Sequence, residues 1–454
     1  MTVIWAKKAL LPDGWSDGVR VDISHEGAIL SVRSGQPPEG TRTGLLLPSP
    51  ANIHSHAFQR TMAGLTERRG PDGRDNFWTW RKLMFRFLER LTPRHIEDIT
   101  AFVQMEMLEA GYAASVEFHY LHHQPDGTPY GKLAEMSERV AAAATTSGAG
   151  LTLLPVLYQY GGCDRRPLGP GQVRFGNDFD RFARLVDEVQ DTMRSLPADC
   201  RLGVAPHSLR AVADKDMAGV EQLLPAGPVH MHLAEQQEEV DEVLERYGTR
   251  PVTWFLDNCN AGPRWCLVHC TRMEQSEAVR LARSGAVAGI CPLTEANLGD
   301  GIFEAGPWFD HDGAIAIGSD SNIRISLAEE LRALEYSQRL RDHARAVLSR
   351  SGHSTGRTLF EAISKGGAAA AGRNSGRIEE GALADLLALD MDSVCLAGLE
   401  GDTLLDSYIF AGDDGLVTDV WSAGRHLVRE GHHVSRDEIV EKYRRTMSEL
   451  RDAL

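Results

Sequence analysis

Histidines stand at the ends of short apolar runs in this sequence, at a spacing that would let their rings meet around a metal ion. The run 48–53 leads into His54-Ser55-His56, and residues 229–231 lead to His232. Alternate residues of a β-strand face the same side, so His54 and His56 would project together. Imidazole nitrogens bind divalent cations such as Zn²⁺. A His-x-His pair alone is equally compatible with two structural histidines, so the prediction depends on further ligands.

Two more apolar runs end in groups that fit the same site. His269 follows residues 266–268, and Asp320 follows an apolar run that ends in Gly318-Ser319. Imidazole and carboxylate ligands around an open position are the donor set expected of catalytic Zn²⁺, although Fe²⁺ and Mn²⁺ accept the same ligand types. The predicted metal ligands are His54, His56, His232 and Asp320.

Acidic and imidazole groups beside these ligands are candidates for proton transfer. Glu235 lies three residues after His232. A divalent cation lowers the pKa of a bound water, and each positioned proton transfer contributes about 10²–10⁴-fold to a rate. We therefore expect Glu235, His269 and Asp320 to be catalytic. Each has an ordinary alternative: a carboxylate at a helix start, a core histidine and a surface N-cap, respectively.

These residues meet only if several strands bring their carboxyl ends to one rim. From about residue 45 the sequence alternates short apolar segments with longer helical patterns, which is typical of parallel β/α units. Eight such segments predict a (β/α)₈ TIM barrel, whose active site lies at the carboxyl ends of its strands. The predicted strands are residues 45–54, 114–119, 151–157, 202–207, 229–233, 266–269, 286–291 and 315–320.

Helical patterns lie between and after these strands. Residues 93–110 have apolar positions at helical spacing, and Thr92 is the expected N-cap. Further helices are predicted at residues 326–348, 354–372 and 437–454.

Short alternating runs with turn residues occur at both ends of the chain and predict one small, discontinuous β-sandwich domain. We expect residues 1–48 and 373–454 to form this domain, with the C-terminal helix included, and residues 49–372 to form the barrel of the metal-dependent hydrolase type.

The composition is that of a globular protein with an acidic surface. The 454 residues include 42% hydrophobic and 25% charged residues, and the net charge is −16. This charge disfavours nucleic-acid binding, and no apolar run is long enough to span a membrane. Seven cysteines without a C-x-x-C pair predict reduced thiols. We expect a cytoplasmic protein with a small-molecule substrate. The sequence leaves open whether the protein forms a homodimer.

The arrangement of ligands resembles the amidohydrolase superfamily: His-x-His on the first strand, histidines on the fifth and sixth, and aspartate on the eighth. Residues 376–390 are also similar to the strand by which these chains re-enter their small β domain. Members with two metal ions use a carboxylated lysine, usually on strand four, but residues 202–208 contain no lysine. His232-Leu233-Ala234-Glu235 resembles the deaminase branch with one metal ion, which implies hydrolytic loss of ammonia.

Longer motifs resemble the formimidoylglutamate deiminases of histidine degradation. They are HSHAFQR at 54–60, FWTWR at 77–81, EFHYLHH at 117–123 and APHSLR at 205–210. The resemblance implies that N-formimidoyl-L-glutamate, a dicarboxylate, reacts with water to give N-formyl-L-glutamate and ammonia. Arginine forks would hold its carboxylates. The expected substrate-binding residues are Gln59, Arg81, Tyr120, His207 and Arg210.

Other interpretations stay open from the sequence. Arg81 also fits a surface position on a tryptophan-rich helix, and Arg210 a loop salt bridge. Another deaminase, acting on guanine, adenosine, cytosine or a triazine, would carry the same ligands but needs fewer cationic contacts. A binuclear amidase would differ in metal content, and an inactive metal-binding scaffold would release no ammonia.

Overall fold

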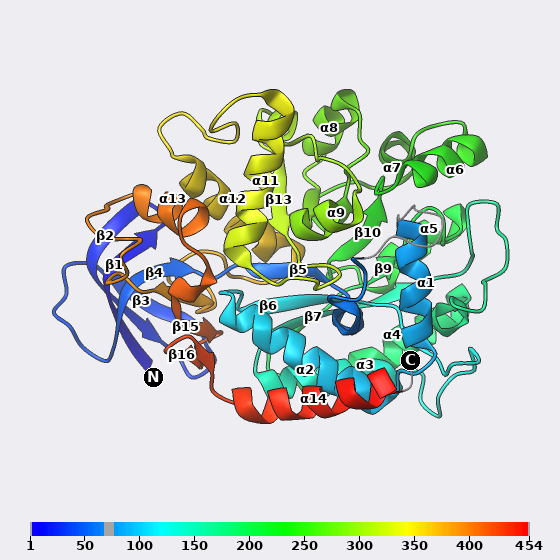
Figure 1. Ribbon diagram of the computed structural model, residues 1–454, viewed down its shortest axis with the longest axis horizontal. Helices are drawn as coiled ribbons and strands as arrows, with labels where there is room; N and C mark the ends of the chain where they lie inside the picture. Colours follow the sequence, from blue (N-terminus) through cyan, green and yellow to red (C-terminus); the bar gives the residue numbers. More distant parts are fainter. Residues whose placement is uncertain (1, 68–76, 453–454) are drawn as a thin grey trace.

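Parallel strands close into a barrel in the part of the chain that the structure describes (Figure 1). The computed structural model describes residues 2–67 and 77–452. The barrel strands form one sheet ordered β5-β6-β7-β8 and one ordered β10-β11-β12-β13, with β9 paired to β7. Their bounds are β5 (Ala51–Ser55), β6 (Ala114–His119), β7 (Gly150–Leu157), β8 (Arg201–Leu202), β9 (Ala205–Pro206), β10 (Val229–Leu233), β11 (Trp265–His269), β12 (Val287–Ile290) and β13 (Ala314–Ile317). The predicted fold class is confirmed.

Backbone hydrogen bonds join the two sheets at both edges. Beside β5 and β13, the His56 amide donates to the carbonyl of Asp320 (2.9 Å), and the Asp320 amide donates to the carbonyl of His54 (2.8 Å). At the other edge, the His230 amide donates to the carbonyl of Val204 (3.1 Å). One of the two seams of the barrel therefore passes through three of the predicted metal ligands.

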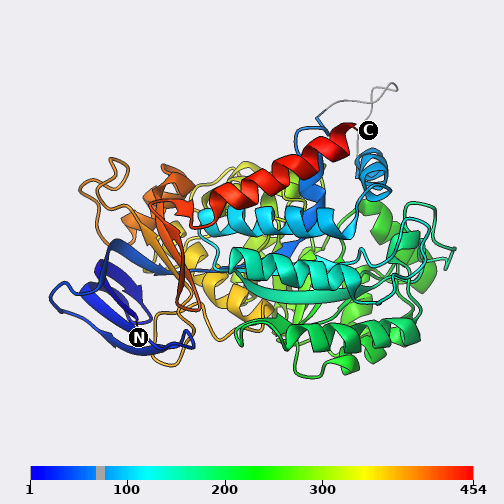
Figure 2. The same cartoon turned by 90° about the horizontal axis from the view of Figure 1, so that it is seen from below.

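Helices cover the barrel strands on the outside (Figures 1 and 2). Every residue of β6, β7, β10, β11 and β12 is buried, as expected for parallel strands covered on both faces. The helices are α1 (Phe77–Leu88), α2 (Pro93–Glu109), α3 (Glu135–Ser147), α4 (Phe179–Met193), α5 (Asp214–Leu223), α6 (Gln237–Tyr247), α7 (Pro251–Asn258), α8 (Gln275–Ala282), α9 (Pro292–Leu298), α10 (Ala305–Phe309), α11 (Leu327–Asp342), α12 (Thr355–Ala370), α13 (Thr403–Phe410) and α14 (Arg436–Asp452).

The two ends of the chain build a second sheet at one end of the molecule (Figures 1 and 2). Its order is β17-β16-β15-β14-β4-β1-β2-β3. The bounds are β1 (Thr2–Leu11), β2 (Gly14–Ile23), β3 (Ile29–Arg33), β4 (Thr41–Pro48), β14 (Leu386–Leu389), β15 (Val417–Ser422), β16 (Arg425–Arg429) and β17 (His432–His433). Parallel pairing of β1 with β4, and antiparallel pairing of β4 with β14, joins the two chain ends into this sheet.

The helix at the C-terminus returns from the second sheet to the barrel. Figure 2 shows α14 lying along α2, and the rings of Phe102 and Tyr443 stack with centroids 3.8 Å apart. Thr92 begins α2 as predicted, because its hydroxyl accepts a hydrogen bond from the His95 amide at 3.3 Å. The helices predicted at 93–110 and 354–372 correspond to α2 and α12 within two residues at each end.

Four predicted elements have boundaries that were wrong. The strand predicted at 202–207 is divided into β8 and β9. The strand predicted at 45–54 is two strands, because Pro48 ends β4 in the second sheet and β5 starts at Ala51 in the barrel. The helix predicted at 326–348 ends at Asp342, where His343 adopts a left-handed φ of 52°. The eighth strand ends at Ile317, so Asp320 lies in the turn after it.

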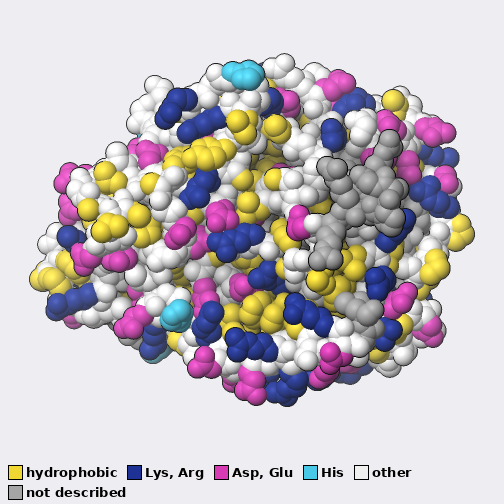
Figure 3. Space-filling model, in the orientation of Figure 1, with side chains coloured by type: hydrophobic (Ala, Val, Ile, Leu, Met, Phe, Trp, Pro, Cys, Tyr) yellow, Lys and Arg dark blue, Asp and Glu magenta, His cyan; other side chains and the backbone are white. Residues whose placement is uncertain are grey.

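The surface mixes charges of both signs. On the face in Figure 3, basic and acidic side chains of the described residues are interspersed rather than gathered into one stripe. Within residues 2–67 and 77–452, no helix is long and apolar enough to cross a membrane.

A buried ion cluster joins the second sheet to the barrel. Arg373 donates to Asp385 at 2.9 Å and to Asp199 Oδ2 at 3.1 Å, while Arg425 donates to Asp199 at 2.7 Å. The side chain of Arg373 is fully buried. Burial alone would raise the pKa of Asp199, but Arg425 and Arg373 lower it overall. Removing the positive charge of Arg373 would therefore leave the negative charges of the buried Asp199 and Asp385 insufficiently compensated.

We expect Arg373→Met to lower the free energy of unfolding by about 3–5 kcal/mol, because breaking a buried ion pair leaves an unpaired charge. Denaturant-induced unfolding followed by circular dichroism measures the change. Arg377→Met is the matched control, since Arg377 pairs with Glu379 at an exposed site and such pairs contribute about 0–1 kcal/mol. Equal effects of the two substitutions would contradict a structural role for the buried cluster.

Candidate metal and substrate site

Four predicted metal ligands converge at the carboxyl-terminal rim of the barrel. The Nε2 atoms of His54 and His232 lie 3.0 Å apart, and Asp320 Oδ1 lies 3.5 Å from His54 Nε2 and 3.4 Å from His56 Nε2. All four side chains are buried. The structure thus brings these residues together from β5, from β10 and from the turn after β13.

Hydrogen bonds fix the orientation of two of these rings. His56 Nδ1 lies 3.0 Å from the carbonyl oxygen of Phe118, and His232 Nδ1 lies 3.2 Å from that of His207. Carbonyl oxygens only accept, so both Nδ1 atoms carry the hydrogen and both Nε2 atoms present lone pairs. Burial lowers the pKa of His54 to about 3, which favours the neutral ring. Neutral imidazoles and a carboxylate that face one another fit a divalent cation.

A buried hydrogen-bond network holds the seam between β5 and the turn after β13. Asn52 Nδ2 donates to Ser319 Oγ at 2.7 Å, and the Ser319 amide donates back to Asn52 Oδ1 at 3.1 Å. Ser319 Oγ donates to Asn322 Oδ1 at 2.6 Å, and Asn322 Nδ2 donates to Ser55 Oγ at 3.2 Å. The network connects the backbone that carries the His-x-His pair to the backbone that carries Asp320.

The backbone takes a left-handed conformation at two site residues. His269 has a φ of 71° and Asp320 a φ of 46°. Such conformations cost side-chain-bearing residues about 1–3 kcal/mol and cluster at functional sites. His269 is the last residue of β11 and pairs with Leu233, while Asp320 pairs with Ser55 beyond the end of β13. At these strand ends His269 Nε2 lies 3.8 Å from Asp320 Oδ2.

Carboxylates surround His269. Its Nε2 atom lies 3.9 Å from Glu235 Oε1, and its Nδ1 atom lies 3.2 Å from Glu295 Oε1. Burial lowers the pKa of His269, but Glu235, Glu295 and Asp320 together raise it to about 10. Burial raises the pKa of Glu235 above its usual value. The pKa values of His269 and Glu235 are therefore both shifted upwards beside the predicted metal ligands, and such perturbed groups are typical of proton-transfer sites.

Glu295 is a site residue that the sequence analysis missed. It lies in α9, where Oε1 accepts hydrogen bonds from His269 Nδ1 at 3.2 Å and from the Cys291 amide at 2.9 Å. A proton on Nδ1 directs Nε2 of His269 towards Glu235 and Asp320. The available signal was the position of Glu295 just after the seventh predicted strand, at the rim where the other candidate residues lie.

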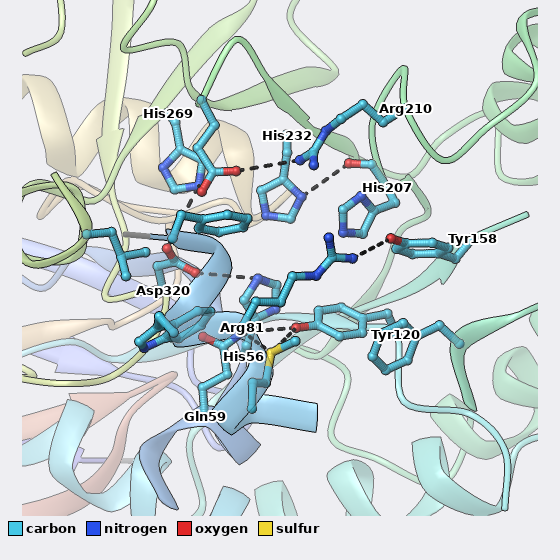
Figure 4. Close-up of a pocket in the computed structure, with 16 residues that line it drawn as sticks. His56, Gln59, Arg81, Tyr120, Tyr158, His207, Arg210, His232, His269 and Asp320 are labelled. Carbon is cyan, nitrogen blue, oxygen red and sulfur yellow. Dashed lines mark hydrogen bonds and ion pairs between the residues drawn. The ribbon is translucent and has the colours of Figure 1, made fainter. Parts of the chain in front are cut away.

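The predicted substrate residues lie in one pocket with the candidate catalytic residues (Figure 4). Gln59 Nε2 donates to Tyr120 Oη at 2.9 Å, and His207 Nδ1 lies 3.0 Å from Ser208 Oγ. The pocket is lined by Gln59, Arg81, Tyr120, His207, Arg210, Glu235, His269 and Asp320, among others. Residues from six different rim segments therefore face one small volume.

The two arginines of this pocket have incomplete partners. Arg81 Nη2 donates to the neutral Tyr158 hydroxyl at 3.0 Å, and Arg81 has no carboxylate at ion-pair distance among the described residues. Arg210 lies 3.9 Å from Glu235, and within residues 2–67 and 77–452 its buried Nε atom has no hydrogen-bond partner. The buried Nε atom of Arg210 and the half-buried guanidinium of Arg81, which has no carboxylate partner among the described residues, both favour a ligand with complementary acceptors, here an anion.

Sequence comparison identifies the family. The profile of the amidohydrolase family matches residues 45–427. The chain belongs to this family. A profile for the N-terminal domain of formimidoylglutamate deiminase HutF matches residues 1–42. The formimidoylglutamate deiminase of Pseudomonas aeruginosa is 46% identical over 459 residues, which cover 100% of both chains.

Two solved structures and a further sequence relative are also similar to this chain. The crystal structure of an amidohydrolase from Brucella melitensis has a TM-score of 0.94 and 46% identity, and covers 99% of this chain and 100% of that chain. An adenosine deaminase from Xanthomonas campestris with bound zinc has a TM-score of 0.83 but 21% identity, over 99% of this chain and 98% of that chain, and shows the fold alone. A 5-methylthioadenosine/S-adenosylhomocysteine deaminase of Natronomonas pharaonis is 28% identical over 82% of this chain and 79% of its own.

We expect about one equivalent of divalent metal per chain in the purified protein, because His54, His56, His232 and Asp320 face one another closely enough to share one ion. His54→Ala and Asp320→Ala should each lower metal content measured by elemental analysis. His230→Gln is the control on the same strand as His232, since His230 Nε2 donates away from the cluster to the Ala370 carbonyl at 2.8 Å. Two full equivalents together with a modified lysine would contradict the site with a single ion.

Proposed function

We propose that this protein is a formimidoylglutamate deiminase that acts in histidine degradation. It would hydrolyse N-formimidoyl-L-glutamate to N-formyl-L-glutamate and ammonia. The full-length similarity to the Pseudomonas aeruginosa enzyme supports this reaction, and so does the matching N-terminal profile. The pocket supports it independently, through the chemistry of its lining residues.

One observation carries the proposal: two arginines line the same pocket as the His/Asp cluster. The protein has a net charge of −16, so an anionic substrate needs local positive charge. Arg81 and Arg210 provide this charge, and we assign them to the substrate carboxylates. Gln59, Tyr120 and His207 would supply neutral hydrogen bonds to the same ligand.

We propose His54, His56, His232 and Asp320 as the ligands of one divalent cation, with Zn²⁺ favoured by nitrogen and oxygen donors. When bound, such a cation supplies a nucleophilic water at neutral pH and polarises the carbon under attack. The Nε2 lone pairs of His56 and His232 point into the cluster because their Nδ1 hydrogens are already donated to carbonyl oxygens.

In the proposed mechanism, this chain's residues move two protons. His269 and Asp320 lie 3.8 Å apart and accept a proton from the attacking water as a C–O bond forms at the formimidoyl carbon. Glu235 lies 3.9 Å from His269 and donates a proton to the terminal nitrogen. The hydrogen left on the water-derived oxygen then passes through the Glu235 carboxylate to the same nitrogen, the C–N bond breaks as the C=O bond forms, and ammonia leaves. The proton held by His269 and Asp320 finally returns to Glu235, so both protons of the water end on ammonia. Glu295 is proposed to orient His269 through its Nδ1 hydrogen.

Glu235→Gln and His269→Asn should each lower kcat by roughly 10²-fold or more while metal content stays normal, because each removes a proton-transfer partner. Ammonia release and elemental analysis measure the two properties on the same samples. Glu238→Gln is the matched control, since this residue lies nearby at the start of α6 and is exposed. Near-normal kcat in both site variants would place the proton transfer elsewhere.

Arg81→Met and Arg210→Met should each lower kcat/KM for N-formimidoyl-L-glutamate by roughly 30-fold or more, without loss of metal. Losing one partner of a buried charge pair typically costs about 2–5 kcal/mol, and 1.4 kcal/mol corresponds to a factor of ten. The experiment compares this substrate with N-formimidoyl-L-aspartate, guanine and adenosine in one ammonia-release assay. A preference of the unmodified protein for a purine would favour the alternative, a deaminase of ring substrates.

A further inference from the structure

Tyr158 occupies a rim position to which the sequence analysis assigned no role. It follows the last residue of β7 directly, so it lies at the carboxyl end of the third barrel strand. Only 4% of its surface is exposed, and it lines the same pocket as Arg81 and Arg210. Its ring packs against that of His207, with centroids 4.5 Å apart. Rim residues of a barrel that face the pocket are positioned to contact the ligand.

Two donors occupy the hydroxyl oxygen of Tyr158. Arg81 Nη2 donates to it at 3.0 Å, as Figure 4 shows, and Gln172 Nε2 donates to it at 2.8 Å. The orientation of the Gln172 amide follows from its other end, because Gln172 Oε1 accepts the Gly169 amide hydrogen at 3.0 Å. The nitrogen of this amide therefore faces Tyr158, and both contacts to the hydroxyl are donated to it.

A phenolic hydroxyl offers one hydrogen besides its acceptor sites. With guanidinium and amide hydrogens both directed at the oxygen, neither partner can accept the hydrogen of Tyr158. An arginine guanidinium has no acceptor at all, and the Gln172 carbonyl is already engaged by Gly169. The O–H group is thus kept as a donor in a pocket that holds two cationic side chains.

We propose that Tyr158 donates its hydroxyl hydrogen directly to the substrate carboxylate that Arg81 binds, and that it thereby helps to select a dicarboxylate. This assignment rests on the proposed function. A carboxylate has about four acceptor positions. Its two oxygens can therefore accept two hydrogen bonds from an arginine and a third from a hydroxyl. Tyr158 also fixes Arg81, because the same oxygen accepts the Arg81 hydrogen while its own hydrogen points to the ligand.

Tyr158→Phe removes the hydroxyl and keeps the ring, and we expect it to lower kcat/KM for N-formimidoyl-L-glutamate at least tenfold. The second measurement separates direct contact from positioning of Arg81. If Tyr158 only positions Arg81, Tyr158→Phe has no further effect when Arg81→Met is already present. If Tyr158 contacts the carboxylate, it lowers kcat/KM at least a further threefold in that background.

Tyr160→Phe is the control, because Tyr160 lies two residues away and packs against Arg165 outside this pocket. We expect unchanged kinetics, and all variants should retain metal and thermal stability. The affinity for the product N-formyl-L-glutamate, measured by calorimetry, should fall in Tyr158→Phe in parallel with kcat/KM.

The substrates themselves provide the last comparison. N-formimidoyl-L-alanine lacks the side-chain carboxylate and N-formimidoyl-4-aminobutyrate lacks the other one. For whichever compound lacks the carboxylate that Arg81 binds, Tyr158→Phe should change kcat/KM less than twofold. Equal losses with both compounds, or no additional loss in the Arg81→Met background, would overturn the proposal. Failure of the proposed function is a separate result, since the unmodified protein would then not hydrolyse N-formimidoyl-L-glutamate, and the assignment of Tyr158 would fall with it.

Discussion

The pair of backbone hydrogen bonds that closes the barrel between β5 and the turn after β13 is the constraint on which the site depends. These bonds join His54 and His56 to Asp320, so the same contacts complete the fold and set the separation of the candidate metal ligands. Side chains of Asn52, Ser319 and Asn322 reinforce the seam from both strands. A change that opened this edge would therefore disturb ligand geometry as well as barrel closure. The left-handed backbone at Asp320 is tolerated because the seam determines its position from both sides.

Burial and charge compensation explain the rest of the site. The rim buries His269 among Glu235, Glu295 and Asp320, and the negative groups outweigh desolvation and raise its pKa. Burial alone would raise the pKa of Asp320, but His54, His269 and His56 hold it well below its usual value. Each ionisable group is thus controlled by its neighbours, and a cation added to this cluster would change all of their proton affinities together. Because of this mutual dependence, the proton affinity of each residue in the cluster depends on the charges of the others.

The barrel and the convergence of its ligands could be predicted from the sequence because they depend on local patterns. Apolar runs ending in His54-Ser55-His56, His232 and Asp320 place side chains on one rim once parallel strands are inferred. Glu295 and Tyr158 could not be assigned in the same way, because their roles arise from contacts with residues 26 and 77 positions away in the chain. The split between β4 and β5 was missed for a related reason. Pro48 and Pro50 interrupt the run 45–54, but the sequence does not show that its first half pairs with the distant β14 in the other sheet.

The partners of the pocket arginines explain how an acidic protein can keep positive charge available to a ligand. A carboxylate beside Arg81 would form an ion pair that a substrate would have to displace. The neutral hydroxyl of Tyr158 instead orients the guanidinium at 3.0 Å without neutralising it. Arg210 lies at 3.9 Å from Glu235, beyond hydrogen-bonding distance, so its donors are also incompletely engaged. Among the described residues these two guanidinium groups are only partly engaged, so they can oppose the net charge of −16 locally within the pocket. Under the proposed assignment of Arg81 and Arg210 to the substrate carboxylates, selection for an anion would depend on which partners the two side chains lack among the described residues as much as on their charge.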